Sequence, residues 1–301
     1  MPSSPSSAEQ EGRVVSGHGR HVVVEGSAGQ RILCHSRGKK SECVVGDRVR
    51  WLPSTDEGVI EAILPRQSLL YRQDAWKTKA FAANIDQLLV VVAAEPVFSE
   101  SQLARALIAA AAAAIPARIV LNKHDLPTFA AAKARLAPYA AIGVDVIGVA
   151  LKKDAEDATV RLAPLLAGKT TLVLGPSGAG KSTLVNLMVV DAAAQVGDIS
   201  TALHTGRHTT TATHWYWIDR ALHSALIDSP GFQEFGLRHI APNELATLMP
   251  DLARYSGACR FYNCTHVHEP GCAVLAALER GEIAATRYRI YCEILAELQP
   301  S

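Results

Sequence analysis

The chain has 301 residues, of which 49% are hydrophobic and 20% charged, and its net charge is +1. This length is typical of two or three domains, and the composition predicts a folded, soluble protein and excludes an intrinsically disordered one. The balanced charge gives no global argument for nucleic acid or a membrane as a partner. Residues 1–12 are rich in Ser, Pro and Glu without an apolar core, which predicts a disordered tail and not a signal peptide.

Residues 13–70 have the pattern of a small all-β domain. Short apolar runs such as 22–24, 44–45 and 49–52 are separated by Gly, Ser and Asp residues. Several strands in so short a segment favour an OB-like barrel, and a plain β sandwich is the alternative.

Residues 71–235 alternate apolar runs with helical stretches, which predicts an open, mostly parallel α/β sheet. Strands are expected at 88–93, 117–121, 144–149, 170–174, 215–218 and 221–227, and helices at 101–114, 130–141, 155–166 and 181–190. The most apolar window, 103–121, is Ala-rich and interrupted by Arg105, Pro116 and Arg118. It predicts a helix followed by a strand and not a membrane span.

A phosphate-binding loop is predicted where the fourth of these strands meets the last of these helices. The sequence G-P-S-G-A-G-K-S fits G-x-x-x-x-G-K-[ST] at every fixed position. Its backbone N–H groups would surround phosphate oxygens, Lys181 would approach the β- and γ-phosphates, and Ser182 would bind Mg²⁺. A structural turn is the alternative, and the loop alone does not separate ATP from GTP. The predicted nucleotide contacts here are Gly175, Pro176, Ser177, Gly178, Ala179, Gly180, Lys181, Ser182 and Thr183.

A guanine-binding N-K-x-D stands before the phosphate loop, although it follows that loop in most GTPases. It consists of Asn122, Lys123, His124 and Asp125. Asp125 could accept hydrogen bonds from guanine N1–H and the 2-amino group, whereas adenine would leave the carboxylate unpaired at a cost of about 1–3 kcal/mol. Because ligands bind at the carboxyl ends of strands in such sheets, this motif and the phosphate loop are expected to converge. The alternative is an N-cap of the next helix.

The motif D-x-x-G follows the strand expected at 221–227. Asp228 would hold Mg²⁺ through water, and the N–H of Gly231 would contact the γ-phosphate. A simple Asp/Pro/Gly turn is the alternative.

A polar stretch at 206–211, Gly-Arg-His-Thr-Thr-Thr, lies where the first switch of a GTPase is expected. Thr210 is chosen over Thr209 as its Mg²⁺ ligand. The glutamine that orients water in many GTPases is replaced by Phe232, so the attacking water needs another partner. His208 is the predicted catalytic residue, and a surface histidine without a role is the alternative.

Three cysteines and a histidine cluster near the C-terminus: Cys259, Cys264, His266 and Cys272. Three thiolates and one imidazole suit tetrahedral Zn²⁺ and leave no open position, so one structural zinc ion is predicted. His268 is the weaker choice of ligand, and buried free thiols or a redox pair are the alternatives. Without a secretory signal, the cysteines indicate a reduced, cytoplasmic chain.

In this order the motifs resemble the ribosome small subunit-dependent GTPase A family of circularly permuted GTPases, over nearly the whole chain. The resemblance also includes Ala-Asn-Ile-Asp-Gln at 83–87 and a final helix with Arg287, Tyr288 and Tyr291. It implies an N-terminal OB barrel (13–70), a permuted GTPase domain (71–235) and a helical zinc-binding domain (236–301). It further implies GTP hydrolysis stimulated by the small ribosomal subunit, a role in late subunit maturation, 16S rRNA as partner and His208 as catalytic residue.

This chain departs from the family pattern in two places. The segment that should offer Ser-Ala to the base reads Val-Ala-Leu at 149–151, and the phosphate loop has Pro176 and Ala179 at variable positions.

Two other functions fit parts of the sequence. One is an ATP-using enzyme with an unrelated structural zinc module, although no L-S-G-G-Q stretch and no Arg cluster follow the loop. The other is a zinc-dependent RNA-binding module with an inactive nucleotide site, against which Lys181, Ser182 and Asp228 argue because all three are intact. A monomer without a membrane partner is expected.

Overall fold

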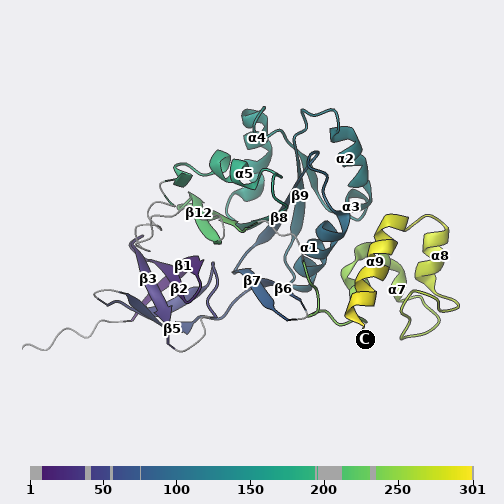
Figure 1. The fold of residues 1–301 in the computed structure, drawn as a ribbon, viewed down its shortest axis with the longest axis horizontal. Coiled ribbons are helices and arrows are strands. Elements are labelled where there is room, and N and C mark those ends of the chain that lie inside the picture. The colour runs from purple at the N-terminus through teal and green to yellow at the C-terminus, as the bar shows by residue number, and fades with distance from the viewer. Residues whose placement is uncertain are drawn as a thin grey trace, which may run out of the picture.

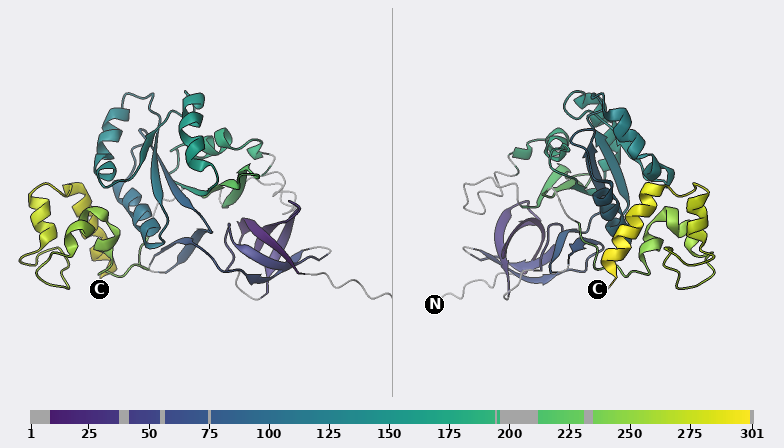
Figure 2. Two further views of the ribbon diagram at one scale, coloured as in Figure 1. Left: turned by 180° about the vertical axis from the view of Figure 1, so that it is seen from behind. Right: turned by 45° about the vertical axis from the view of Figure 1, so that its right-hand side comes forward.

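The computed structural model describes residues 9–37, 42–54, 57–74, 76–193, 195, 212–230 and 235–299. A β barrel lies at one end of the molecule and a helical C-terminal region at the other, with an α/β domain between them (Figure 1). The views in Figure 2 show the same order of the three parts from behind and in an oblique view. The predicted fold class is thereby confirmed, whereas the residue boundaries of the three domains stay predictions.

Five strands close the N-terminal barrel in the order β1-β2-β3-β5-β4, with β4 returning to β1. They are β1 (Gln10–His18), β2 (His21–Gly26), β3 (Arg31–Ser36), β4 (Arg48–Leu52) and β5 (Gly58–Ile63). All neighbours are antiparallel except β3 and β5. Trp51, the valines of β1, β2 and β4, Cys34 of β3 and Ile60 of β5 fill the interior, so this is the expected OB-like barrel.

Two local expectations for this region were wrong. The apolar run at 44–45 is a turn before β4, where the Val44 N–H donates to the Asp47 carboxylate at 2.8 Å. The tail predicted to end at residue 12 includes the start of β1, because Gln10 pairs with Trp51 of β4.

A hairpin of β6 (Leu69–Gln73) and β7 (Thr78–Ala83) forms a separate two-stranded sheet between the barrel and the central sheet. The central sheet has the order β10-β9-β8-β11-β13-β12. Its strands are β8 (Gln87–Ala93), β9 (Ala117–Asn122), β10 (Val146–Gly148), β11 (Thr170–Leu174), β12 (His214–Asp219) and β13 (Ser224–Asp228). Only β12 runs antiparallel to its neighbour in this sheet, so β8, β9, β11 and β13 end at the same edge.

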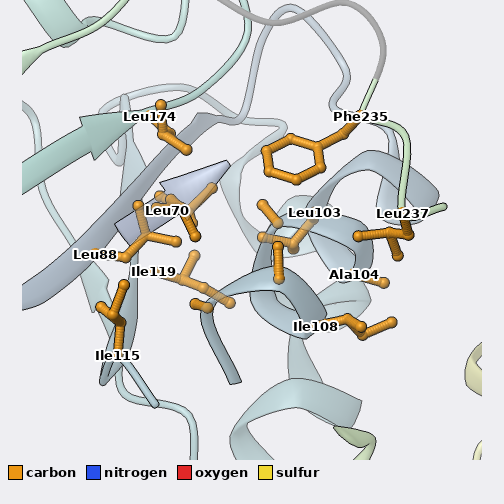
Figure 3. Packing of buried hydrophobic residues seen from close by; sticks show 14 of the residues in the cluster. Leu70, Leu88, Leu103, Ala104, Ile108, Ile115, Ile119, Leu174, Phe235 and Leu237 are labelled. Atoms are coloured by element: carbon orange, nitrogen blue, oxygen red, sulfur yellow. The ribbon is translucent and has the colours of Figure 1, made fainter. Parts of the chain in front are cut away.

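Helices cover both faces of the central sheet. The helices α4 (Ala155–Leu166) and α5 (Lys181–Met188) pack on one face, and α1 (Glu100–Ala112), α2 (Phe129–Arg135) and α3 (Ala137–Ala141) on the other. Figure 3 shows Leu103 of α1 towards Leu88 and Ile119 of the sheet, and Ala104 and Ile108 of the same helix near Leu237, all in one core. Alternate residues of each strand thus pack into the cores on opposite faces of the sheet. This packing fixes the positions of the loops at the strand ends.

Two of the differences from the predicted boundaries have a local physical cause. The helix expected at 130–141 is divided at Leu136, because Pro138 lacks the N–H that a continuous helix needs. The strand expected at 221–227 begins at Ser224, because residues 220–223 form a turn in which the Leu222 N–H donates to Asp219 at 3.0 Å.

The C-terminal region consists of η1 (Leu245–Leu248), α7 (Pro250–Ser256), α8 (Ala273–Glu279) and α9 (Ala285–Leu298). Arg287 joins two of these helices through a buried, two-bonded ion pair with Asp251 at 2.8 and 3.0 Å. Its guanidinium also lies 4.8 Å from the ring of Tyr139, which connects the region to the α/β domain. Within the described part of the chain, no helix has both the length and the apolar character needed to cross a membrane.

Candidate functional site

The predicted phosphate loop joins the end of β11 to the start of α5, and its glycines are required by close contacts. Gly175 has φ +154°, and a Cβ there would lie 2.1 Å from the carbonyl oxygen of Val91. Gly180 has φ +109°, and its Cβ would lie 2.3 Å from Nδ2 of Asn122. Neither position has room for a side chain, so the loop backbone packs directly on β8 and on the predicted guanine motif. Ser177, Gly178 and Ser182 are exposed, whereas Ala179 is buried.

Lys181 and Asp228 are two oppositely charged groups of this site that act on each other electrostatically. The Lys181 ammonium donates to the carbonyls of Gly175 at 2.9 Å and Pro176 at 3.0 Å, so it lies over its own loop. Burial lowers the pKa of Lys181, and the negative charge of Asp228 opposes this. Burial also raises the pKa of Asp228 to about 6, although Lys181 opposes that rise.

Buried oxygens next to Lys181 fit a cation. The Oδ1 atom of Asp228 has no hydrogen-bond partner among the described residues, and neither has Oγ of Ser229. A buried carboxylate oxygen without a partner is costly unless a ligand satisfies it. The residues present therefore fit Mg²⁺ and bound water, with Asp228 as the acidic group. Ser229 was missed because a variable position of D-x-x-G gives no sequence signal.

Asn122 joins the predicted guanine motif to the phosphate loop. Its side-chain N–H donates to the carbonyl of Ala179 at 2.9 Å, across 57 positions of sequence. Its Oδ1 accepts hydrogen bonds from the N–H groups of Lys123 at 2.7 Å and Leu151 at 3.1 Å. The two loops therefore converge at one edge of the sheet, as their positions after β9 and β11 predicted.

The other residues of this motif form the exposed turn after β9. Lys123 has φ +67°, and its ammonium donates to the carbonyl of Glu95. The His124 N–H donates to the carbonyl of Val149 at 3.0 Å, and Asp125 is exposed. The Val-Ala-Leu segment that departs from the family pattern is thus held against the motif by two hydrogen bonds: the Val149 carbonyl accepts from the His124 N–H, and the Leu151 N–H donates to the Asn122 side chain. The base contacts of Asp125 stay a prediction.

The three cysteines and the histidine predicted to bind zinc lie together. Their four donor atoms are all within 4.8 Å of one another. The sulfurs of Cys259 and Cys272 are 3.8 Å apart, and Nδ1 of His266 is 3.4 and 3.5 Å from them. In a tetrahedron with zinc–sulfur bonds of about 2.3 Å, sulfurs lie roughly 3.8 Å apart and a nitrogen slightly closer. The cluster therefore fits a zinc site and has no disulfide geometry.

Hydrogen bonds from outside the cluster hold its loop. The hydroxyl of Tyr291 donates to the carbonyl of Thr265 at 2.8 Å, and that of Tyr288 donates to the carbonyl of His266 at 2.7 Å. The Glu269 carboxylate accepts from the N–H groups of Thr265 at 2.8 Å and His268 at 3.2 Å. Supporting groups of this kind orient metal ligands. The structural role of Glu269 was not predicted, since an acidic residue three positions away from a ligand has no distinctive sequence pattern.

Three predicted residues lie outside the described residues: His208, Thr210 and Gly231. The same holds for Phe232 and for the rest of the 206–211 stretch.

The fold and the convergence of the two loops define a circularly permuted P-loop GTPase. The profile of the RsgA GTPase family matches residues 63–238. The small ribosomal subunit biogenesis GTPase RsgA of Variovorax paradoxus (strain S110) is 58% identical over 296 residues, which cover 97% of this chain and 93% of that protein. This chain therefore belongs to the RsgA GTPase family and is a GTPase, and the ATP-using alternative is not retained.

Two solved structures share the whole fold. YjeQ from Thermotoga maritima has a TM-score of 0.71 at 30% identity and is covered to 99%, with 97% of this chain matched. YloQ, a circularly permuted GTPase, has a TM-score of 0.69 at 27% identity, with both chains covered completely.

Proposed function

We propose that this chain hydrolyses GTP during late maturation of the small ribosomal subunit, binds the 16S rRNA of that subunit, and is stimulated by it. The relative from Variovorax paradoxus is a small ribosomal subunit biogenesis GTPase, and the similarity extends over nearly the full length of both chains. The observation that carries the GTP part is the side chain of Asn122. It connects the guanine motif to the phosphate loop at a hydrogen-bond distance of 2.9 Å.

Each loop has a role in this proposal. Residues 122–125 hold guanine, with Asp125 accepting from its N1–H and 2-amino groups, while residues 175–183 surround the phosphates. Lys181 leaves the carbonyls of Gly175 and Pro176 to approach the β- and γ-phosphates. Ser182 and Asp228 hold Mg²⁺, which would neutralise charge on the phosphate oxygens.

The remaining assignments concern residues outside the described part of the chain. Thr210 would join Ser182 as a Mg²⁺ ligand, Gly231 would donate its N–H to the γ-phosphate, and His208 would orient the attacking water. Because Phe232 stands in the usual glutamine position, intrinsic hydrolysis should be slow and should rise when the subunit binds.

The C-terminal region would hold one structural Zn²⁺ through Cys259, Cys264, His266 and Cys272. A closed Cys₃His set stabilises a fold and has no position for substrate. We further propose a cytoplasmic monomer, in keeping with reduced cysteines and work on ribosomal subunits.

GTP turnover measured with and without purified small ribosomal subunits tests the proposed function. We expect slow turnover of GTP alone, a rise of about tenfold or more with subunits, and no comparable turnover of ATP. The matched control is Lys181→Ala, which should abolish both rates. Equal rates with and without subunits would overturn the ribosomal part, and equal use of ATP would overturn the guanine assignment.

A further inference from the structure

The barrel meets the GTPase domain at a polar cluster that none of the sequence motifs includes. We call it the Glu25 cluster. Its members are Glu25 and Arg31 of the barrel and Gln195, Trp217 and Arg220 of the GTPase domain. Glu25 and Arg31 face each other as a cross-strand pair of β2 and β3. Their side chains are only 5% and 6% exposed, so this is a buried ion pair at a domain boundary.

The Glu25 carboxylate takes most of its hydrogen bonds from the other domain. Arg31 donates to it at 3.0 Å from within the barrel. The indole N–H of Trp217 donates at 2.7 Å, and Arg220 donates twice, at 2.8 and 3.0 Å. A buried carboxylate that loses such donors pays the full cost of desolvation, so this contact fixes the position of β12 relative to the barrel.

Arg31 also contacts Gln195, which precedes the predicted first switch in the sequence. Its Nη1 donates to the carbonyl of Gln195 at 2.7 Å. The side chain of Gln195 in turn accepts from the N–H of Trp217 at 3.0 Å and donates to the carbonyl of Trp217 at 3.2 Å. Residues immediately before and shortly after the segment 196–211 are therefore joined to each other and to one arginine of the barrel.

Further contacts hold the same strand. The guanidinium of Arg13 lies 4.4 Å from the ring of Trp215, and Ser16 shares a hydrogen bond of 3.0 Å with His214. His214 is the residue directly opposite Asp228 in the register of β12 and β13. The strand that the barrel holds is thus the neighbour of the strand that ends in the predicted Mg²⁺-binding aspartate.

A domain interface that served only to attach the barrel would not need to join both ends of one segment. Here a single buried pair does so, and that segment contains the predicted catalytic residues of the first switch. We propose that Glu25 and Arg31 are positioning residues for GTP hydrolysis, through which the barrel holds Gln195 and Trp217, which lie on either side of segment 196–211 in the sequence. The proposal rests on the assignment of the first switch to 206–211. A partner that binds the barrel would then change the rate of GTP hydrolysis through Glu25 and Arg31.

The test uses the full-length chain without ribosomal subunits. Arg31→Gln removes the donors to Glu25 and to the Gln195 carbonyl, and Arg50→Gln makes the same change at an exposed barrel arginine that pairs with Glu9. We expect the kcat of Arg31→Gln to fall by about tenfold or more, with GDP affinity within about twofold of the original chain. The control should keep both values. GDP affinity is measured with a fluorescent GDP analogue, because GDP lacks the γ-phosphate that the first switch would contact.

Gln195→Ala is the second variant, and it leaves the barrel pair intact. Gln195→Ala should lower kcat in the same way. If Arg31→Gln does not fold, Gln195→Ala alone tests the proposal. A kcat within about twofold of the original chain in the folded variants would overturn the proposal. A parallel loss of GDP affinity would overturn it as well, since that would indicate general damage to the nucleotide site. Because no ribosomal subunit is present, failure here is separate from failure of the ribosomal function.

Discussion

Two carboxylates of this molecule differ in how the protein treats their charge. Glu25, at the junction of barrel and GTPase domain, is buried with donors on both oxygens. Burial raises the pKa of Glu25, but hydrogen bonds from Arg220, Trp217 and Arg31 outweigh it and the net pKa is lowered. Asp228, in the nucleotide site, keeps a buried oxygen without a partner in the described structure, and burial raises its pKa to about 6.

The protein itself supplies the hydrogen-bond donors for the charge of Glu25, whereas the charge of Asp228 is suited to a bound ligand. The junction is complete without any other molecule, whereas the nucleotide site needs a cation beside Asp228. The Cys₃His cluster resembles the nucleotide site in this respect, because its four donor atoms contact mainly one another and fit a metal ion. We therefore expect the largest effect on stability when a side chain that would bind a metal ion is replaced.

Cys272→Ser should produce the largest effect on stability. Structural zinc sites have apparent binding free energies of about 10–16 kcal/mol, which become folding free energy of the region around them. The variant should lose its zinc, and α8 and α9 should lose protection from hydrogen exchange, while GDP binding in the GTPase domain persists. Zinc content and hydrogen exchange measure this.

Cys292→Ser is the matched control for that experiment. Cys292 lies on α9 in the same region but outside the cluster. It should keep one zinc ion per chain. A Cys272→Ser variant that also keeps one zinc ion would contradict the Cys₃His assignment.

Asp228→Asn should separate function from stability. Without the carboxylate charge, GTP turnover should fall by about a hundred- to a thousandfold. The ligand-free chain should nevertheless gain about 2–3 kcal/mol, because the shift of the pKa from 3.8 to about 6 means that the ionised group disfavours folding. This gain is full above pH 6 and disappears as the pH falls from 6 towards 3.8. Urea unfolding across this range measures it, and a loss of stability at pH 8 would refute the comparison.

The nucleotide site and the junction also differ in how far the sequence predicts them. Asn122 and Gly180 belong to short motifs that follow β9 and β11, two parallel strands on either side of β8, so their convergence at one edge follows from the topology of such sheets. Arg31 and Gln195 are separated by 164 positions and belong to no motif, so only the assembled structure brings them together. Predicted helix and strand boundaries were wrong where a single residue breaks the structure that the apolar pattern indicates, as Pro138 does between α2 and α3.

Asp125→Asn tests whether the exposed turn after β9 selects guanine. An amide cannot accept from both N1–H and the 2-amino group, so the affinity for GTP should fall by about a hundredfold. Xanthine carries an oxygen in place of the 2-amino group, and the asparagine amide can donate to it. Affinity for xanthosine triphosphate should therefore rise in the variant. Unchanged affinities for both nucleotides would show that Asp125 does not contact the base.

Glu25→Gln should have the smallest effect and the opposite sign to Asp228→Asn. Glutamine keeps the shape but removes the charge that Arg31 and Arg220 contact, so the free energy of unfolding at pH 7 should fall by about 1–3 kcal/mol. Since the folded pKa of Glu25 lies below the usual 4.5, its stabilisation is present above that pH and is lost as the pH falls through the folded pKa. The cost of Glu25→Gln should therefore shrink between pH 7 and pH 3. Unfolding of both carboxylate variants along one pH series measures the two trends together. If Glu25→Gln raised stability at pH 7 as Asp228→Asn does, the junction would be a site that still lacks its ligand.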